Sequence, residues 1–339
     1  MTMRDAYPTR WGQRWAGRVA AAALGLSVLT VGVQTAHAAI PEPAGDIQAW
    51  IERLHDATRN RAYSGTFVVT RGSEIAAARI AHVCDGRQQI ERIEALNGPA
   101  RITWRRDDEV MTLLPDKQWA VRDRRELLRL FPGPVRVPGI EVAGFYRAEV
   151  RGSERLAGFD AWVVEFQPRD ALRYGYRIWS EKRTGLVLKL QTLKADGEVL
   201  EQVAFTELQL DAPLRLEVMA RQMDDTRGYR IERPTLRKTT PEAEGWRLKT
   251  EVPGFRPVTC WARAEEPARA RPPLQCVYSD GLASVSLFFS AADGPPVHRT
   301  QAGATHVLSQ RVGGYAVTAL GEVPLATLER FLGALERTR

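Results

Sequence analysis

The sequence has few cysteines and histidines, and its longest apolar run is too short to span a bilayer, which needs roughly 20 apolar residues. Its 339 residues include three cysteines and five histidines, and no two histidines stand at the H-x-x-x-H spacing of a metal site. It also lacks a G-x-S-x-G turn, a glycine-rich phosphate loop and an S-x-x-K motif. These absences make a hydrolase the minor alternative, which stays open because distant residues can assemble a triad.

The longest apolar run lies near the N-terminus. Residues 1–38 hold four arginines, an apolar stretch at 19–33 and the triplet Ala36-His37-Ala38. A basic start, a short apolar stretch and an A-x-A site predict a secretory signal peptide that is cut between Ala38 and Ala39. A retained N-terminal anchor is the alternative. No cysteine follows the site to carry a lipid, so we expect a soluble protein of the periplasm.

The charge is basic overall but unevenly distributed. The chain has 48 Lys+Arg and 41 Asp+Glu, a net charge of +7. Residues 39–212 hold 26 side chains of each sign, whereas residues 213–339 hold 18 basic and 14 acidic ones. Because the exported part is nearly balanced, nucleic acid is not an expected partner. The excess makes the second domain and its linker the electropositive part of the chain.

Hydrophobic periodicity predicts a mainly β protein. Apolar residues recur at helical spacing from Ile47 to Ala57, directly after Asp46, a suitable N-cap. Between residues 63 and 210, short alternating segments separated by turns such as Asp196-Gly197 predict an antiparallel meander. We therefore expect a large curved antiparallel sheet with the helix on its concave side.

A second, smaller domain is expected towards the C-terminus. Alternation weakens after Pro213 and resumes at Trp246, and the chain closes with an apolar helical stripe that begins after Pro324. The expected organisation is a signal peptide at 1–38, a half-barrel domain at 39–212, a linker at 213–240, and a small antiparallel sheet with a C-terminal helix at 241–339.

Pairing is the default for cysteines in an oxidising compartment. Cys260 and Cys276 are equidistant from the tip of a predicted hairpin and would face each other across its strands, so we expect a disulfide between them. Cys84 is then left over. We expect it to be a buried apolar residue, since no C-x-x-C motif supports a redox thiol.

Aromatic and arginine residues of the first domain are the candidate binding residues. A curved sheet with a helix in its mouth cannot fill its own concavity, which leaves an apolar groove for an acyl chain or a peptide. The groove candidates are Trp104, Trp119, Phe145, Tyr146, Trp162, Tyr176 and Trp179, with ordinary core packing as the alternative for each. Candidate contacts for phosphate or carboxylate headgroups are Arg101, Arg105, Arg106, Arg124 and Arg125, with a solvated surface as the alternative. The sequence offers no cofactor or metal site.

Four segments also suggest a family. They are WIERL at 50–54, YSGTFV at 63–68, YSDGLASVSLF at 278–288 and GGYAVTALGEVP at 313–324. In order and spacing they resemble the RseB/MucB family of periplasmic regulators of an envelope-stress sigma factor. The resemblance implies a first domain similar to the lipoprotein carriers LolA and LolB. Such a domain is an unclosed antiparallel β-barrel with a helix in it, which agrees with the predicted meander. It also implies a partner, the periplasmic segment of a membrane anti-sigma factor of the RseA/MucA type, with no catalytic residues to carry over.

The family resemblance further implies that binding shields the anti-sigma factor from proteolysis, and that lipid or lipopolysaccharide fragments release it. We therefore interpret the chain as a binding and sensor protein and not as an enzyme. Its basic second domain would dock the anti-sigma factor, and its first domain would hold the sensory groove. A periplasmic carrier of lipids or lipoproteins is the alternative, and the sequence leaves homo-oligomer formation open.

Overall fold

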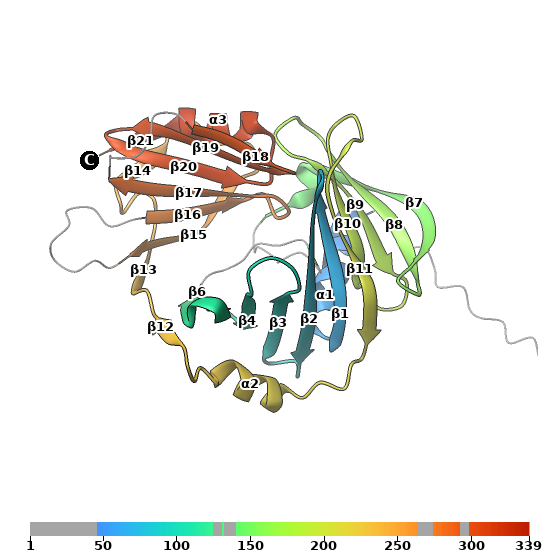
Figure 1. Cartoon of the computed structure of the whole chain (residues 1–339). Coiled ribbons are helices and arrows are strands. Elements are labelled where there is room, and N and C mark those ends of the chain that lie inside the picture. Colours follow the sequence, from blue (N-terminus) through green and yellow to red (C-terminus); the bar gives the residue numbers. More distant parts are fainter. Residues whose placement is uncertain (1–45, 125–130, 132–139, 264–273, 292–297, 339) are drawn as a thin grey trace, which may run out of the picture. The chain divides into compact units, whose positions relative to one another are not determined.

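A twelve-stranded sheet forms the N-terminal part of the chain in a computed structural model, which describes residues 46–124, 131, 140–263, 274–291 and 298–338. Its strands are β1 (Tyr63–Arg71), β2 (Glu74–Cys84), β3 (Gln89–Ala95), β4 (Ile102–Arg106), β5 (Glu109–Leu114), β6 (Trp119–Arg124), β7 (Tyr146–Leu156), β8 (Phe159–Pro168), β9 (Gly175–Glu181), β10 (Val187–Leu193), β11 (Val199–Leu210) and β12 (Arg230–Glu232). Their order is β12-β6-β5-β4-β3-β2-β1-β11-β10-β9-β8-β7, so the sheet is not closed (Figure 1). Neighbours are antiparallel except for β12, which pairs with β6 in parallel.

A seven-stranded antiparallel sheet forms the C-terminal part. Its strands, in their order across the sheet, are β13 (Leu236–Thr239), β15 (Arg256–Arg263), β16 (Leu274–Ser279), β17 (Ser284–Ala291), β20 (Tyr315–Gly321), β19 (Thr305–Val312) and β18 (His298–Ala302). Helix α3 (Leu325–Ala334) packs on β19 and β20, and its Phe331 contacts Tyr278 of β16. The short strands β14 (Trp246–Leu248) and β21 (Leu335–Arg337) pair with each other.

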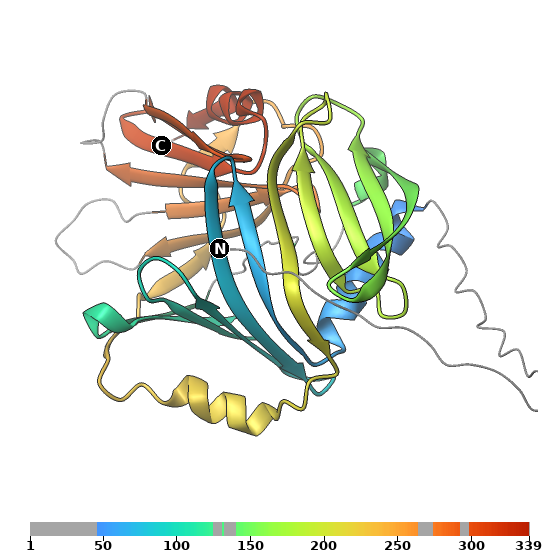
Figure 2. The ribbon, with the colours of Figure 1, turned by 45° about the vertical axis from the view of Figure 1, so that its right-hand side comes forward.

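Helix α1 (Ile47–Arg59) covers one face of the large sheet. The Asp46 carboxylate accepts a hydrogen bond from the Gln48 amide at 2.9 Å, which caps the helix as the sequence predicts. Trp50 and Leu54 are fully buried in a cluster with Phe166 of β8 and other apolar side chains of the sheet. Figure 2 shows β8 to β11 curving around α1, so this part of the meander has a helix on its concave side.

Helix α2 (Leu216–Asp224) lies on the opposite face, at the other end of the sheet. Its Met219 and Met223 pack with Trp104 of β4 and Met111 of β5. Successive strand residues point to opposite faces, and in β2 Ile80 joins the α1 cluster whereas Val83 joins the α2 cluster. We call the face opposite α1 the outer face.

The fold class is the one expected from the sequence: a large unclosed sheet with an N-terminal helix, and a smaller antiparallel sheet with a C-terminal helix. The interval 213–240, predicted as a linker, holds α2, β12 and β13. The predicted signal peptide and its cut at Ala38 and Ala39 lie outside the described residues. Within those residues, no helix is long and apolar enough to cross a membrane.

The expected cysteine pair closes the β15–β16 hairpin. Cys260 and Cys276 are directly opposite in the antiparallel register, and their sulfurs are bonded at 2.05 Å. Both side chains face the apolar core under α3. Cys84, at the end of β2, has no disulfide partner and is half-buried.

The large-sheet domain also contains two short 3-10 turns and a glycine that lies inside a strand. The turns are η1 (Pro115–Lys117) and η2 (Val142–Gly144). Gly65 of β1 lies so close to β11 that an added Cβ would come within 2.3 Å of the Glu207 carbonyl oxygen. Any other residue there would push the two strands apart, which explains a glycine inside a strand.

Candidate functional site

Four of the seven predicted groove aromatics lie together on the α1 face. Tyr146, Trp162 and Tyr176 belong to the cluster around α1, and Phe145 packs at its margin. The Tyr146 and Tyr176 rings are 6.2 Å apart, and the Lys182 ammonium lies 4.1 Å from the centre of the Trp162 ring. Of these four, Tyr146 and Tyr176 are fully buried in the core, whereas Phe145 and Trp162 are half-buried. A half-buried ring with a cation over it, as at Trp162, suits the anionic end of an acyl ligand.

The other three aromatics lie elsewhere. Trp104 packs under α2, and Trp179 belongs to a small cluster with Val163 on the outer face. Trp119 is half-buried beside β12 at the end of the sheet. The predicted groove residues therefore fall into separate regions of the sheet.

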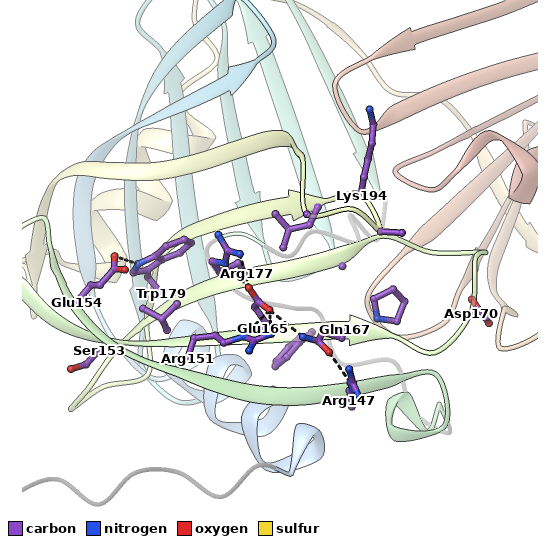
Figure 3. A pocket seen from close by; sticks show the side chains of 17 residues that line it. Arg147, Arg151, Ser153, Glu154, Glu165, Gln167, Asp170, Arg177, Trp179 and Lys194 are labelled. Carbon is purple, nitrogen blue, oxygen red and sulfur yellow. Dashed lines mark hydrogen bonds and ion pairs between the residues drawn. The ribbon is translucent and has the colours of Figure 1, made fainter.

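The outer face has a hollow of about 790 Å³ over β7 to β10. Its floor includes Glu165, which is only 7% exposed and sits between two arginines (Figure 3). Arg151 donates to one carboxylate oxygen at 2.8 and 2.9 Å, and Arg177 donates to the other at 2.6 and 2.7 Å. Gln167 adds a bond of 3.1 Å and itself accepts one from Arg147 at 2.7 Å.

The charges of this hollow are satisfied within it. Burial alone would raise the pKa of Glu165, but the hydrogen bonds from Arg151, Arg177 and Gln167 outweigh it and hold that pKa below its usual value. At the rim, Lys194 pairs with Glu198 at 2.5 Å. The arrangement is a closed ionic network, in which Arg151, Arg177 and Lys194 have carboxylate partners and Arg147 donates to the Gln167 amide oxygen.

A second hollow, of about 650 Å³, lies at the opposite end of the sheet, where β12 adds to β6. It is lined by Lys117, Trp119 and residues 230–233. Glu232 contributes its carboxylate, but Arg263 of β15 holds that group at 3.1 Å. In contrast to the outer-face hollow, cations predominate here.

The predicted headgroup arginines are also divided between the faces. Arg106 is bound by Asp224 of α2 and by Glu109, both at 3.1 Å, and so belongs to the outer face. Arg105 points to the other side of β4 and lies opposite Glu91. Arg101 is exposed. The side chain of Arg124, and Arg125 altogether, lie outside the described part of the chain.

Pattern reasoning missed a buried ion pair between the two sheets. The Arg173 side chain is completely buried, and its Nε donates to Asp280 at 2.8 Å. The Tyr146 hydroxyl donates to the same carboxylate at 3.1 Å, and Arg173 also reaches the Pro253 carbonyl at 2.7 Å. A buried pair of this kind holds its elements in one arrangement, because separating it leaves an uncompensated charge. Asp280 lies in the 278–288 segment, which pointed to the family but not to this role.

The histidines are poorly placed for catalysis. In His82, Nδ1 lies 3.0 Å from the Arg61 carbonyl, and in His306 it lies 2.9 Å from the Val323 carbonyl. Burial lowers the pKa of both rings. Among the described residues, no three His, Cys, Asp or Glu side chains come together as a metal site.

Comparison with known families gives matches to both parts of the chain. The MucB/RseB N-terminal domain matches residues 46–225, and the MucB/RseB C-terminal domain matches residues 240–336. Among curated relatives, the sigma factor AlgU regulatory protein MucB of Pseudomonas aeruginosa is 31% identical over 296 residues, which cover 85% of this chain and 90% of the relative. The sigma-E factor regulatory protein RseB of Haemophilus influenzae is 23% identical and covers 83% and 88% of the two chains.

Solved structures point to the same family. A crystal structure of MucB in complex with MucA(peri) superposes with a TM-score of 0.65 at 28% identity, covering 87% of this chain and all of that chain. A crystal structure of MucB without that partner gives a TM-score of 0.63 at 24% identity and supports the fold alone. With both domains matched in order along most of its length, the chain belongs to the MucB/RseB family.

Proposed function

We propose that this chain binds the periplasmic segment of a membrane-spanning anti-sigma factor and thereby regulates an envelope-stress sigma factor. The observation that carries the proposal is the shared fold and sequence, over both domains, with a MucB chain whose structure was solved in complex with MucA(peri). The function requires a surface that binds a protein segment. The protein would act in the periplasm, after removal of residues 1–38.

Binding would regulate by shielding the anti-sigma segment from the protease that cleaves it. A lipid or lipopolysaccharide fragment would reverse this if it favours the conformation that does not bind the segment, because its differential binding energy is then subtracted from that of the partner. Within the described residues, the half-buried Trp162 with Lys182 over its ring is the place that best supports such a ligand.

A pull-down tests the proposal in its biological setting. The purified protein, immobilised and incubated with solubilised inner membranes, should retain a membrane anti-sigma factor as a major bound protein. Added lipopolysaccharide should reduce the retained amount, whereas a neutral detergent at equal concentration should not. Retention of no anti-sigma factor, with the immobilised protein folded, would contradict the proposed function.

Trp162 with Lys182 over its ring also supports a second candidate, a carrier of lipids or lipoproteins. A carrier delivers its acyl ligand to an acceptor, and it needs no anti-sigma factor to do so. Transfer of a fluorescent acyl ligand from this protein to acceptor vesicles, at a rate that the anti-sigma segment does not change, would favour the carrier. A regulator should release its ligand when the segment binds, because the coupling between two sites is reciprocal.

A further inference from the structure

The hollow beside β12 carries positive charge that its surroundings do not neutralise. Lys117, Arg230 and Arg233 are exposed, and none of them forms an ion pair with another residue in the described ranges. The carboxylate of Glu232 is occupied by Arg263. An unpaired cation cluster of this kind attracts anionic groups over a distance of about one Debye length.

The same place has an available strand edge. The Arg230 amide donates to the Gln118 carbonyl at 2.8 Å, so the backbone of Arg230 faces β6. Backbone groups of successive strand residues point in opposite directions, and Ile231 therefore directs its amide and carbonyl away from β6. Within the described chain, β12 has no strand on that outer side. An extended peptide can add to such an edge through main-chain hydrogen bonds.

Trp119 gives the site an apolar element. It is the register partner of Arg230, and its half-buried ring lines the hollow between the cations. A simple inorganic anion would use the charges but neither the strand edge nor the ring. An extended peptide would use all three features when an acidic and an apolar residue stand two positions apart, because Trp119 and Arg230 are register partners and project from the same face of the sheet.

We propose that this linker edge, made of Lys117, Trp119, Arg230 and Arg233, binds an extended acidic peptide segment of a partner protein. Glutamate or aspartate side chains pair with the arginines, whose forked guanidinium groups match a carboxylate. The peptide backbone bonds to Ile231, and an apolar side chain packs on Trp119. This proposal goes beyond the proposed function because it names the kind of peptide that the linker edge binds. That binding can be measured with a synthetic peptide and without an anti-sigma factor.

The test uses a fluorescein-labelled octapeptide, Glu-Ser-Leu-Ser-Glu-Ser-Leu-Ser, which places glutamate and leucine on the same face of an extended strand. Fluorescence anisotropy is the readout. The purified protein should bind this peptide at low salt and progressively less tightly as salt is added. Arg230→Glu with Arg233→Glu should weaken binding by roughly tenfold or more, because like charges then oppose the peptide. The matched control is Arg155→Glu with Arg299→Glu, which makes the same change of charge at exposed positions outside the hollow and should bind as the unchanged protein does.

A milder pair of variants keeps the test valid if charge reversal disturbs folding. Arg230→Gln with Arg233→Gln should weaken peptide binding by at least about threefold, and Trp119→Leu should weaken it without changing its salt dependence. Equal binding by the reversed variant and its control would overturn the proposal. It would also be overturned if phosphatidylglycerol vesicles bound through these arginines while the peptide did not.

Discussion

The two ends of the large sheet both gather cations, but they use them differently. Over β7 to β10, Arg151 and Arg177 are fixed on the buried carboxylate of Glu165, and the charges cancel. Beside β12, Arg230 and Arg233 have no carboxylate partner among the described residues. Charge clusters of similar composition are thus a structural network at one end and an available surface at the other. The difference is that the strand register of β7 to β9 places the Glu165 carboxylate between Arg151 and Arg177, whereas beside β12 the Glu232 carboxylate pairs with Arg263 instead.

The largest effect is expected at the closed network. Glu165→Gln removes the negative charge that Arg151 and Arg177 share. The two guanidinium groups then repel each other without a carboxylate between them. The free energy of unfolding should fall by about 2–4 kcal/mol, measured by urea denaturation.

Glu149→Gln is the matched control for this change. Glu149 also pairs with Arg151, but its side chain is 45% exposed, and its loss should cost less than about 0.5 kcal/mol. Equal costs for the two substitutions would mean that the outer-face network is no more important to stability than an ordinary surface pair.

The same carboxylate predicts a dependence of stability on pH. The pKa of Glu165 in the folded protein lies below its ordinary value of 4.5, so the unfolded chain takes up the proton first. Its contribution is therefore complete above about pH 4.5 and is lost as the pH falls through the lower, folded value. Denaturation between pH 6 and pH 3 should show a steeper loss for the unchanged protein than for Glu165→Gln, and parallel curves would argue against the network.

Ligand binding should distinguish the two faces of the sheet. Trp162 lies on the α1 face and Trp179 on the outer face, so only Trp162→Leu should weaken an acyl ligand that occupies the α1 face, by roughly fivefold for one lost aromatic contact. A fluorescent fatty-acid titration measures both variants. Equal weakening by Trp162→Leu and Trp179→Leu would show that the ligand does not select the α1 face.

The smallest effect on stability is expected at the linker edge. Arg230→Gln with Arg233→Gln changes two exposed side chains that make no ion pair in the described structure, so the free energy of unfolding should stay within about 0.5 kcal/mol of the original. Urea denaturation beside Glu165→Gln provides the comparison. A loss as large as that of Glu165→Gln would show that these arginines are structural too.

Much of the fold could be predicted because it depends on local patterns. Alternating segments and turn residues predicted an antiparallel meander over residues 63–210 and the return of strands at Trp246, and the symmetry of one hairpin paired Cys260 with Cys276. Helix α2 was missed because it is short and follows Pro213 in a stretch with little apolar periodicity. Its packing depends on Trp104 and Met111, which are distant in sequence.

The binding residues were harder to predict, because a side chain's face depends on strand register. Trp162 and Trp179 both lie in alternating strands, yet Trp179 is opposite Val163 and so faces away from Trp162. A bulge between Val187 and Lys189 changes the alternation again. Sequence patterns show in which strands apolar and polar residues alternate. They do not show which residues of two separate strands lie on the same face of the sheet.

The most direct measurement is a calorimetric titration of the purified protein with the purified periplasmic segment of the anti-sigma factor from the same organism. The proposed function predicts saturable binding with one segment per chain and a dissociation constant at or below about 1 μM. Prior addition of a lipopolysaccharide fragment should weaken it. The absence of binding at about 100 μM segment, with both components folded, would contradict the proposal that this chain regulates through an anti-sigma factor.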